Sequence, residues 1–183
     1  DYYMNRVINI LKKKNKRTAA WNEAALSPHN DIGSSGGTGN IDKSCLIFAW
    51  EHPSVSNESV KMGFQTIMCP GQKTYFDMAY NNATSERGIC WAATIEASEI
   101  HSWKPLKDVD KDYHNLILGI QGQLWSETIT KPEYLDTQIN PRLACLSEVA
   151  WCSDNRRGWA EFKPTLLHNM KILSKLGWKY HDF

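Results

Sequence analysis

The chain has 183 residues and a formal net charge of +1. This length allows one domain with a substantial core, but it falls short of the roughly 250 residues of a complete eight-unit α/β barrel. The near-neutral charge gives no support for a nucleic-acid partner, and no apolar run approaches the roughly 18 residues that a membrane span needs.

The five cysteines form no CxxC pair, and no histidine lies at metal-ligand spacing. We therefore predict neither a zinc site nor a disulfide framework. Reduced, buried thiols are the expectation, because free cysteine commonly packs as a small hydrophobe. No cofactor is predicted.

Helical and strand patterns alternate along the chain. Tyr3, Val7, Ile10 and Leu11 recur at helical spacing, which predicts a first helix. Apolar runs then predict strands at about 18–21, 45–50, 65–69 and 116–124. The run at 45–50 is continuously apolar, which suits a strand buried on both faces. Further helices are expected over 57–64, over 94–103 and from 131 to the end. This order predicts about four βα units, which is half of a barrel.

The C-terminal helices have recognisable ends and faces. Asn140 is expected to cap a helix that has Pro141 at its first position and Leu143, Leu146 and Ala150 on one face. A further helix is expected to end at Gly177. Its apolar face would be formed by Trp159, Phe162, Leu166, Met170 and Leu173.

Two long segments lack periodicity. Residues 27–44 contain a Gly/Ser-rich stretch without the flanking strand and helix of a phosphate-binding motif, so a flexible loop is predicted. Residues 70–93 have many turn formers and aromatics, and a loop of that length in a compact domain is usually functional or disordered. We predict one partial domain over 1–183 with 70–93 as its active-site loop.

Three short runs end in a tryptophan followed within two positions by an acid or amide. These tryptophans are Trp21, Trp50 and Trp125. If each run is a strand, the indoles lie at the C-terminal ends of a parallel sheet, where such sheets build binding sites. Aromatic rings beside carboxylates suit a sugar. Core packing is the alternative reading of the three, and packing is the expected role of Trp103, Trp151, Trp159 and Trp178.

Several of these segments, in order, resemble the C-terminal half of the catalytic barrel of glycoside hydrolase family 20, the β-N-acetylhexosaminidases. The matching segments are Trp21-Asn22-Glu23, Ala49-Trp50, Pro70-Gly71 leading to Tyr75-Phe76-Asp77, Gly88 to Trp91, Leu118 to Glu127, and Asn140 to Trp151. The resemblance implies an α/β fold, the C-terminal half of a TIM (β/α)8 barrel, in which four strands cannot close on themselves.

The resemblance also implies roles for seven residues in a substrate-assisted retaining reaction, in which the 2-acetamido oxygen of the sugar attacks the anomeric carbon. Three tryptophans would wall the acetamido pocket: Trp21, Trp50 and Trp125. Tyr75 would donate a hydrogen bond to the acetamido oxygen, and Asp77 and Glu127 would accept hydrogen bonds from ring hydroxyls. Trp91 would be a platform for the next sugar.

One departure limits what the chain does alone. The family takes its acid from an adjacent Asp-Glu pair, and no such dipeptide exists in this sequence. Asn22-Glu23 follows the first tryptophan and is not expected to replace that pair. Because general acid catalysis is typically worth about 10² to 10⁴ in rate, the isolated chain should hydrolyse little or nothing.

Other interpretations stay open at this point. Tyr75 and Asp77 also suit a surface turn, Glu127 suits a helix N-terminus, and Trp91 lies in the least periodic region. The partner would be an N-acetylhexosamine-containing glycan together with the missing half of the barrel or a second copy. A lectin-like binding module and an unrelated α/β domain are the rivals. Periplasmic, secreted and lysosomal locations all suit the intact enzyme, and the sequence does not choose among them.

Overall fold

The structure is a computed structural model that describes residues 1–26, 36–152 and 155–183. The chain divides into two compact units: unit 1 comprises residues 1–70 and 105–121, and unit 2 comprises residues 71–104 and 122–183. Of the predicted flexible loop over 27–44, residues 27–35 lie outside the described residues. Residues 36–44 form bends and turns without a helix or strand.

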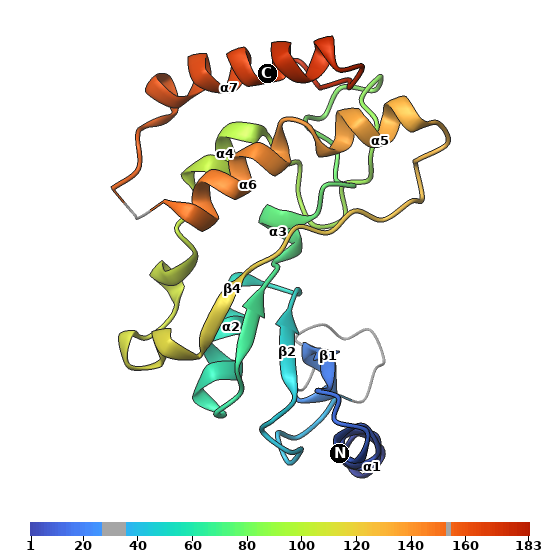
Figure 1. Cartoon of the computed structure of the whole chain (residues 1–183), viewed down its shortest axis with the longest axis vertical. Coiled ribbons are helices and arrows are strands. Elements are labelled where there is room, and N and C mark those ends of the chain that lie inside the picture. Colours follow the sequence, from blue (N-terminus) through green and yellow to red (C-terminus); the bar gives the residue numbers. More distant parts are fainter. Residues whose placement is uncertain (27–35, 153–154) are drawn as a thin grey trace. The chain divides into compact units, whose positions relative to one another are not determined.

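Unit 1 is built on a parallel sheet with the strand order β1-β2-β3-β4 (Figure 1). The strands are β1 (Ala19–Trp21), β2 (Leu46–Ala49), β3 (Thr66–Met68) and β4 (Ile117–Ile120). Trp21 pairs with Phe48, and Phe48 with Ile67. The predicted α/β fold with four parallel strands is confirmed, although each strand is shorter than its apolar run.

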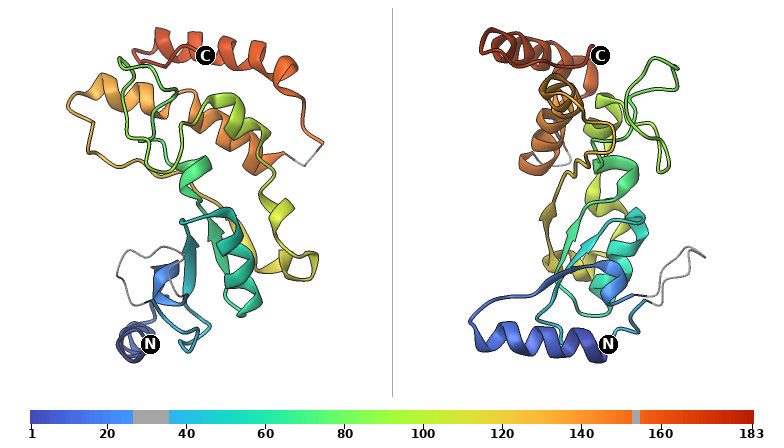
Figure 2. Two further views of the ribbon diagram at one scale, coloured as in Figure 1. Left: turned by 180° about the vertical axis from the view of Figure 1, so that it is seen from behind. Right: turned by 90° about the vertical axis from the view of Figure 1, so that its right-hand side faces the viewer.

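Within the described residues of unit 1, five helical segments accompany this sheet. They are α1 (Tyr2–Lys13), η1 (Asn22–Ala24), α2 (Pro53–Lys61), η2 (Pro105–Asp108) and η3 (Lys111–Leu116). Helix α2 begins where the His52 side chain accepts a hydrogen bond from the Ser54 N–H and Pro53 supplies a preset φ. It lies against one face of the sheet (Figure 2) and binds β3 through the buried hydroxyls of Ser59 and Thr66, 2.8 Å apart.

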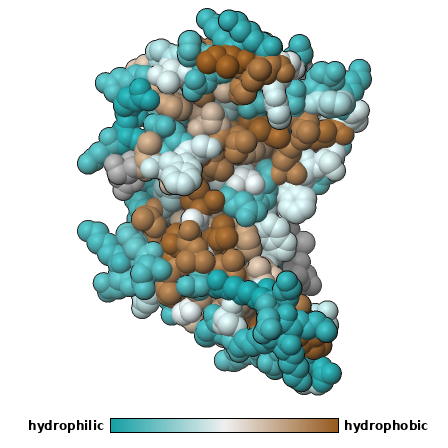
Figure 3. All heavy atoms as spheres, viewed as in Figure 1, coloured by the Kyte–Doolittle hydropathy of each residue, from teal (hydrophilic) through white to brown (hydrophobic). Residues whose placement is uncertain are grey.

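The two faces of the sheet differ in burial. Ile47 and Ala49 alternate toward the buried side and join a core with Val55 of α2, whereas Phe48 between them is only partly buried. On the less buried face, Trp21, which pairs with Phe48, is exposed. Figure 3 shows apolar residues gathered over the strands in this view. Strands β1 and β4 form the two edges of the sheet.

Unit 2 is mainly helical. Its helices are α3 (Gly71–Thr74), α4 (Ala97–Ser102), α5 (Pro132–Ile139), α6 (Arg142–Trp151) and α7 (Trp159–Lys175). Helix α4 contacts both α6 and α7, and the His101 ring stacks on Phe162 at 4.5 Å. Phe162, Leu166 and Met170 are the buried residues of α7, and Gly177 follows its end with φ of 94°. The predicted apolar face of this last helix is therefore confirmed at its centre.

The predicted first helix is confirmed as α1, although its buried residue is not one of the apolar residues that predicted it, and the predicted apolar face of α6 is wrong. In α1 the buried residue is Ile8, whereas Tyr3 and Ile10 are exposed, because the helix contacts the core of unit 1 through Met4 and Ile8. Helix α6 begins at Arg142 with Pro141, not Asn140, at the N-cap position.

Burial in and after α6 also differs from the prediction. The buried residues of α6 are Arg142, Cys145, Leu146 and Val149, so Leu143 and Ala150 lie on its exposed side. All five cysteines are free thiols, but Cys90 and Cys152 are exposed rather than buried. The packing role predicted for the C-terminal tryptophans fails for Trp151 and Trp178, which are 90% and 45% exposed.

The core contact of α1 makes a testable prediction. Replacing Ile8 with Ala should lower the free energy of unfolding by about 2–5 kcal/mol, because a fully buried aliphatic side chain leaves a cavity. Ile10→Ala in the same helix is the matched control and should change it by no more than about 0.5 kcal/mol, since Ile10 is 53% exposed. Urea denaturation of both variants measures the difference, and equal losses would contradict the assignment of the buried face.

Candidate functional site

Two of the three predicted strand-end tryptophans lie where the sequence places them. Trp21 is the last residue of β1, and Trp50 directly follows β2. Trp125 is different, because β4 ends at Ile120 and the following residues belong to unit 2 from Gly122 onward. The predicted strand over 116–124 is too long because Gln123 pairs with residues 74–76 instead of continuing along β3.

A polar network holds Trp50 in unit 1. The indole Nε1 donates to Glu23 Oε2 at 2.9 Å, and the Trp50 backbone N–H donates to Asn22 Oδ1 at 3.1 Å. The Asn22 amide in turn donates to Glu51 Oε2 at 3.0 Å. Asn22 and Glu23 therefore hold Trp50 in place through hydrogen bonds. They can reach it because they directly follow β1, which pairs with β2. The sequence reasoning missed this role, although Glu51 also follows a strand-end tryptophan.

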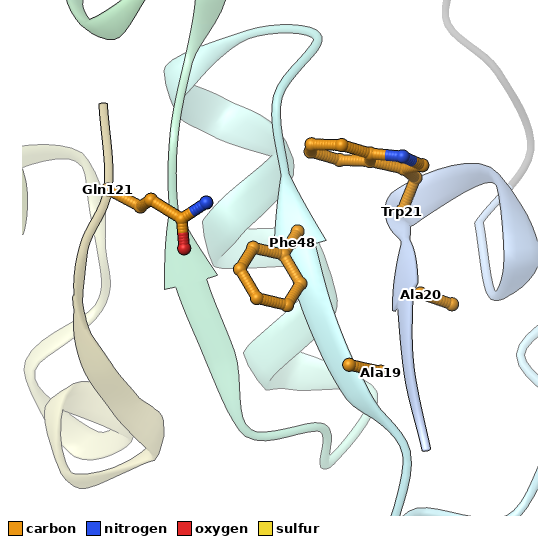
Figure 4. A pocket seen from close by; sticks show the side chains of 5 residues that line it. All are labelled: Ala19, Ala20, Trp21, Phe48 and Gln121. Carbon is orange, nitrogen blue, oxygen red and sulfur yellow. The ribbon is translucent and has the colours of Figure 1, made fainter. Parts of the chain in front are cut away.

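Trp21 borders an open hollow of about 270 Å³ on the sheet of unit 1. The hollow is lined by Ala19, Ala20, Trp21, Phe48 and Gln121. Trp21 and Phe48 meet edge to face with ring centroids 5.8 Å apart, and Figure 4 shows their rings and the Gln121 amide extending toward the same space. An apolar wall with one amide group can hold a partly apolar ligand with polar substituents.

Unit 2 brings the remaining predicted residues together through its backbone. Tyr75 pairs with Gln123 as an isolated parallel bridge: the Gln123 N–H donates to the Thr74 carbonyl at 2.9 Å, and the Phe76 N–H donates to the Gln123 carbonyl at 2.7 Å. This pairing places the 75–77 segment beside the segment that leads to Trp125.

The aromatic rings of unit 2 form a cluster around Tyr75. Its ring centroid is 5.8 Å from that of Trp91, at 80° between the planes, and 6.2 Å from that of Trp125. Tyr75 is buried, whereas Trp91 and Trp125 are 54% and 42% exposed. The two indoles therefore present partly solvent-accessible faces next to a buried phenol, which contradicts a surface turn at Tyr75.

Trp91 reaches this cluster because its loop is bonded to the 77–79 segment. The Ile89 N–H donates to the Asp77 carbonyl at 3.0 Å, and the Ala79 N–H donates to the Ile89 carbonyl at 2.7 Å. Gly88 precedes this contact with φ of 120°, and a Cβ there would lie 2.6 Å from the Ala79 nitrogen. Only glycine fits this close approach, so it sets the path of the loop toward Trp91.

Asp77 is the most unusual polar side chain of unit 2. Asp77 is 1% exposed, and neither of its carboxyl oxygens makes a hydrogen bond of normal geometry within the part of the chain that the structure describes. Burial raises the pKa of Asp77, and the negative charge of Glu127 raises it further. Backbone N–H groups of Asp77 and Trp125 and the charge of Arg142 offset part of this rise in pKa.

The seven predicted site residues thus fall into two groups. Trp21 and Trp50 belong to unit 1, and the other five belong to unit 2: Tyr75, Asp77, Trp91, Trp125 and Glu127. Glu127 is exposed and acts on Asp77 through its charge. Over residues 1–26, 36–152 and 155–183, no group of three His, Cys, Asp or Glu side chains could hold a metal ion, and no helix there is long and apolar enough to cross a membrane.

A parallel α/β sheet with aromatic and acidic side chains beyond its strand ends is typical of enzymes of the (β/α) barrel class. The sequence profile described as "Glycosyl hydrolase family 20, catalytic domain" matches residues 1–154. The chain therefore belongs to glycoside hydrolase family 20.

Proteins of similar sequence are β-hexosaminidases. A β-N-acetylhexosaminidase from Cellulomonas fimi is 24% identical over 94% of this chain and 33% of its own length. A β-hexosaminidase from Vibrio furnissii is 32% identical over 75% of this chain and 21% of its own. The chain thus spans a third or less of the length of these relatives.

Solved structures match over almost the whole chain. The family 20 exo-β-N-acetylglucosaminidase of Vibrio harveyi, solved in complex with N-acetylglucosamine, is 27% identical with a TM-score of 0.86, covering 99% of this chain and 27% of that one. The chain therefore corresponds to part of a family 20 barrel.

The burial of Asp77 predicts a pH-dependent effect on stability. Because its folded-state pKa is raised, ionisation disfavours the folded state at any pH above the unfolded-state value of about 3.9, and this penalty disappears as the pH falls below that value. Asp77→Asn should therefore raise the urea midpoint at pH 7, and its advantage should shrink toward pH 3.

Asp112→Asn is the matched control, because Asp112 is exposed in unit 1 and should change the free energy of unfolding by no more than about 0.5 kcal/mol. An Asp77→Asn variant with a lower midpoint at pH 7 than the unsubstituted chain would contradict the assigned penalty.

Proposed function

We propose that this chain supplies most of the sugar-binding wall of a β-N-acetylhexosaminidase, as the C-terminal half of its barrel, and that the intact enzyme hydrolyses terminal non-reducing N-acetylhexosamine residues. The observation that carries the proposal is the cluster in unit 2, where the buried carboxyl group of Asp77, whose oxygens make no hydrogen bond of normal geometry to the described residues, lies on the same short segment as Tyr75, which contacts two partly exposed indoles. The N-acetylglucosamine bound by the Vibrio harveyi relative supports this substrate class.

The residues of unit 2 suit the proposed roles chemically. Asp77 is an acceptor whose oxygens make no ordinary hydrogen bond within the described chain, so hydroxyl groups of a sugar would satisfy it, and Glu127 would accept at the solvent side. The Tyr75 hydroxyl would donate to the acetamido oxygen and hold it near the anomeric carbon, as substrate-assisted retention requires. Trp91 would be the platform for the leaving-group sugar.

The tryptophans provide the apolar part of the pocket. Trp21, Trp50 and Trp125 would wall the acetamido group and exclude water from it. The bond from Trp50 to Glu23 fixes one of these rings. It also engages one oxygen of the Glu23 carboxyl group, which is in keeping with a supporting role for Glu23.

The proton donor is proposed to lie outside this chain. The sequence has no adjacent Asp-Glu pair, so the isolated chain is proposed to be inactive and to need the other half of a barrel. The open sheet edges at β1 and β4 are where further strands would pair. The alternative is a lectin-like module that binds the sugar without hydrolysing it.

Sugar binding is tested by titrating the chain with N-acetylglucosamine and following tryptophan fluorescence. Trp125→Ala should weaken binding roughly thirtyfold, the effect of about 2 kcal/mol that is common for a buried contact of tryptophan. Trp151→Ala is the control and should bind like the unsubstituted chain, since Trp151 is 90% exposed on α6. Absence of sugar binding by the unsubstituted chain would contradict the proposed sugar-binding wall.

Hydrolysis separates the enzyme from the lectin. The chain alone should leave a chromogenic N-acetylglucosaminide intact, and adding a polypeptide with the first half of a family 20 barrel should restore turnover. Tyr75→Phe should then lower turnover by about 10² to 10³, the usual effect of removing one hydrogen bond to a developing charge. Binding without turnover in the reconstituted mixture would favour the lectin-like module.

A further inference from the structure

We propose that Arg142 is a positioning residue that fixes the directions in which Tyr75 and Asp77 leave the backbone toward a bound sugar. This inference rests on the function proposed above. Nothing in the sequence pattern singles out Arg142 for this role, because an arginine at the start of a helix is usually solvated.

The surroundings of Arg142 connect several segments of unit 2. Its side chain is fully buried at the first position of α6. Nη1 donates to the Phe76 carbonyl at 2.6 Å and to Gln138 Oε1 at 2.9 Å, and Nε donates to the Ile95 carbonyl at 3.0 Å. The guanidinium carbon lies 3.4 Å from the ring centroid of Tyr80. One planar cation therefore ties α6 to α5 and to both ends of the segment from Phe76 to Ile95.

The bond to the Phe76 carbonyl is the contact that matters for the site. Phe76 separates Tyr75 from Asp77, and its N–H is already bonded to the Gln123 carbonyl at 2.7 Å. Because peptide groups are planar, holding the N–H on one side and the carbonyl on the other fixes the two peptide planes that flank Phe76. The Tyr75 and Asp77 side chains then leave the backbone in set directions.

The charge of Arg142 has a second effect on Asp77. Both groups are buried in unit 2, and the positive charge of Arg142 lowers the pKa of Asp77 against the larger effect of burial. Burial lowers the pKa of Arg142, and the charges of Tyr80, Glu86, Glu96 and Asp77 oppose this effect. Arg142 thus favours the ionised, hydrogen-bond-accepting form of the carboxyl group that the proposed sugar contact uses.

Lysine should not replace this side chain. A buried cation is tolerated only when its donors find acceptors, and the rigid fork of arginine reaches three acceptors from one plane. The ammonium group of lysine keeps the charge but cannot reach the Phe76 and Ile95 carbonyls and Gln138 in the same geometry. The Lys variant therefore separates geometry from charge, and the Met variant removes both.

The test uses the whole chain and three measurements for each variant: thermal unfolding, N-acetylglucosamine binding by tryptophan fluorescence, and the titration of the Asp77 carboxyl carbon by NMR. Arg142→Lys should weaken sugar binding at least tenfold. Arg142→Met should do the same and should also move the Asp77 titration midpoint to higher pH, because the neighbouring positive charge is lost.

Arg156→Lys and Arg156→Met are the matched controls. Arg156 also donates to a backbone carbonyl, that of His101, through Nε at 2.9 Å and Nη2 at 2.7 Å. These controls should lower the unfolding temperature while leaving sugar affinity within twofold and the Asp77 titration unchanged. Sugar affinity that falls equally in the Arg142 and Arg156 variants, or an Arg142→Lys variant that binds like the unsubstituted chain, would overturn the proposal.

Two further outcomes keep the conclusions separate. If the Met variant does not fold, the Lys variant alone decides the geometric role. If the unsubstituted chain does not bind the sugar, the proposed function fails, and the Asp77 titration then decides the question for Arg142: an upward shift in Arg142→Met supports its action on Asp77, and an unchanged midpoint overturns it.

Discussion

The parallel pairing between Tyr75 and Gln123 is the constraint on which the candidate site of unit 2 depends. Two hydrogen bonds, from Gln123 to Thr74 and from Phe76 to Gln123, bring together segments that are distant in sequence. Gly122 permits this approach, because a Cβ there would lie 2.7 Å from the Phe76 ring. The Phe76 ring thus packs against a residue that has no side chain, and Tyr75 comes within ring contact of Trp125. This pairing therefore brings the segment with the buried Asp77 carboxyl group next to the segment that leads to the Trp125 indole.

In unit 1, side-chain hydrogen bonds rather than backbone pairing fix the position of a tryptophan. Its parallel strands end side by side, so the residues that follow β1 and β2 are close without further help. Asn22 uses both ends of its amide there, accepting from the Trp50 N–H and donating to Glu51. Such a buried amide is stable only when both of its ends find partners, which specifies one arrangement of the two strand ends. In each unit, buried polar groups hold an aromatic ring that a hydrophobic core alone would leave free to repack.

The features that sequence predicts here are those set by local patterns. Apolar runs predict the four strands, and the positions of the runs predict that Trp21 and Trp50 lie at strand ends. Patterns fail where tertiary contacts decide: helix α1 has apolar residues on more than one side, and packing selects Ile8 rather than Ile10. The buried role of Arg142 is not predictable either, because its acceptors come from Phe76, Ile95 and Gln138, which only the folded backbone brings to one place. The irregular 75–95 segment has no period because several of its backbone hydrogen bonds, such as Ile89 to Asp77 and Phe76 to Gln123, join residues that are far apart in sequence.

Two of the buried polar groups that weaken the fold of unit 2 belong to Asp77 and Arg142. Asp77 is buried without a hydrogen bond of normal geometry among the described residues, and burial raises its pKa. Nη2 of Arg142 is likewise buried without a partner in the described chain. A protein selected for stability alone would replace such groups with apolar ones, since a buried polar atom without a partner is unfavourable by about 1–3 kcal/mol. Their presence beside Tyr75 and Trp125 is explained if a ligand rich in hydroxyl groups supplies the missing hydrogen bond to Asp77. The cationic network behind Asp77 then stabilises the carboxylate in the form that accepts this bond.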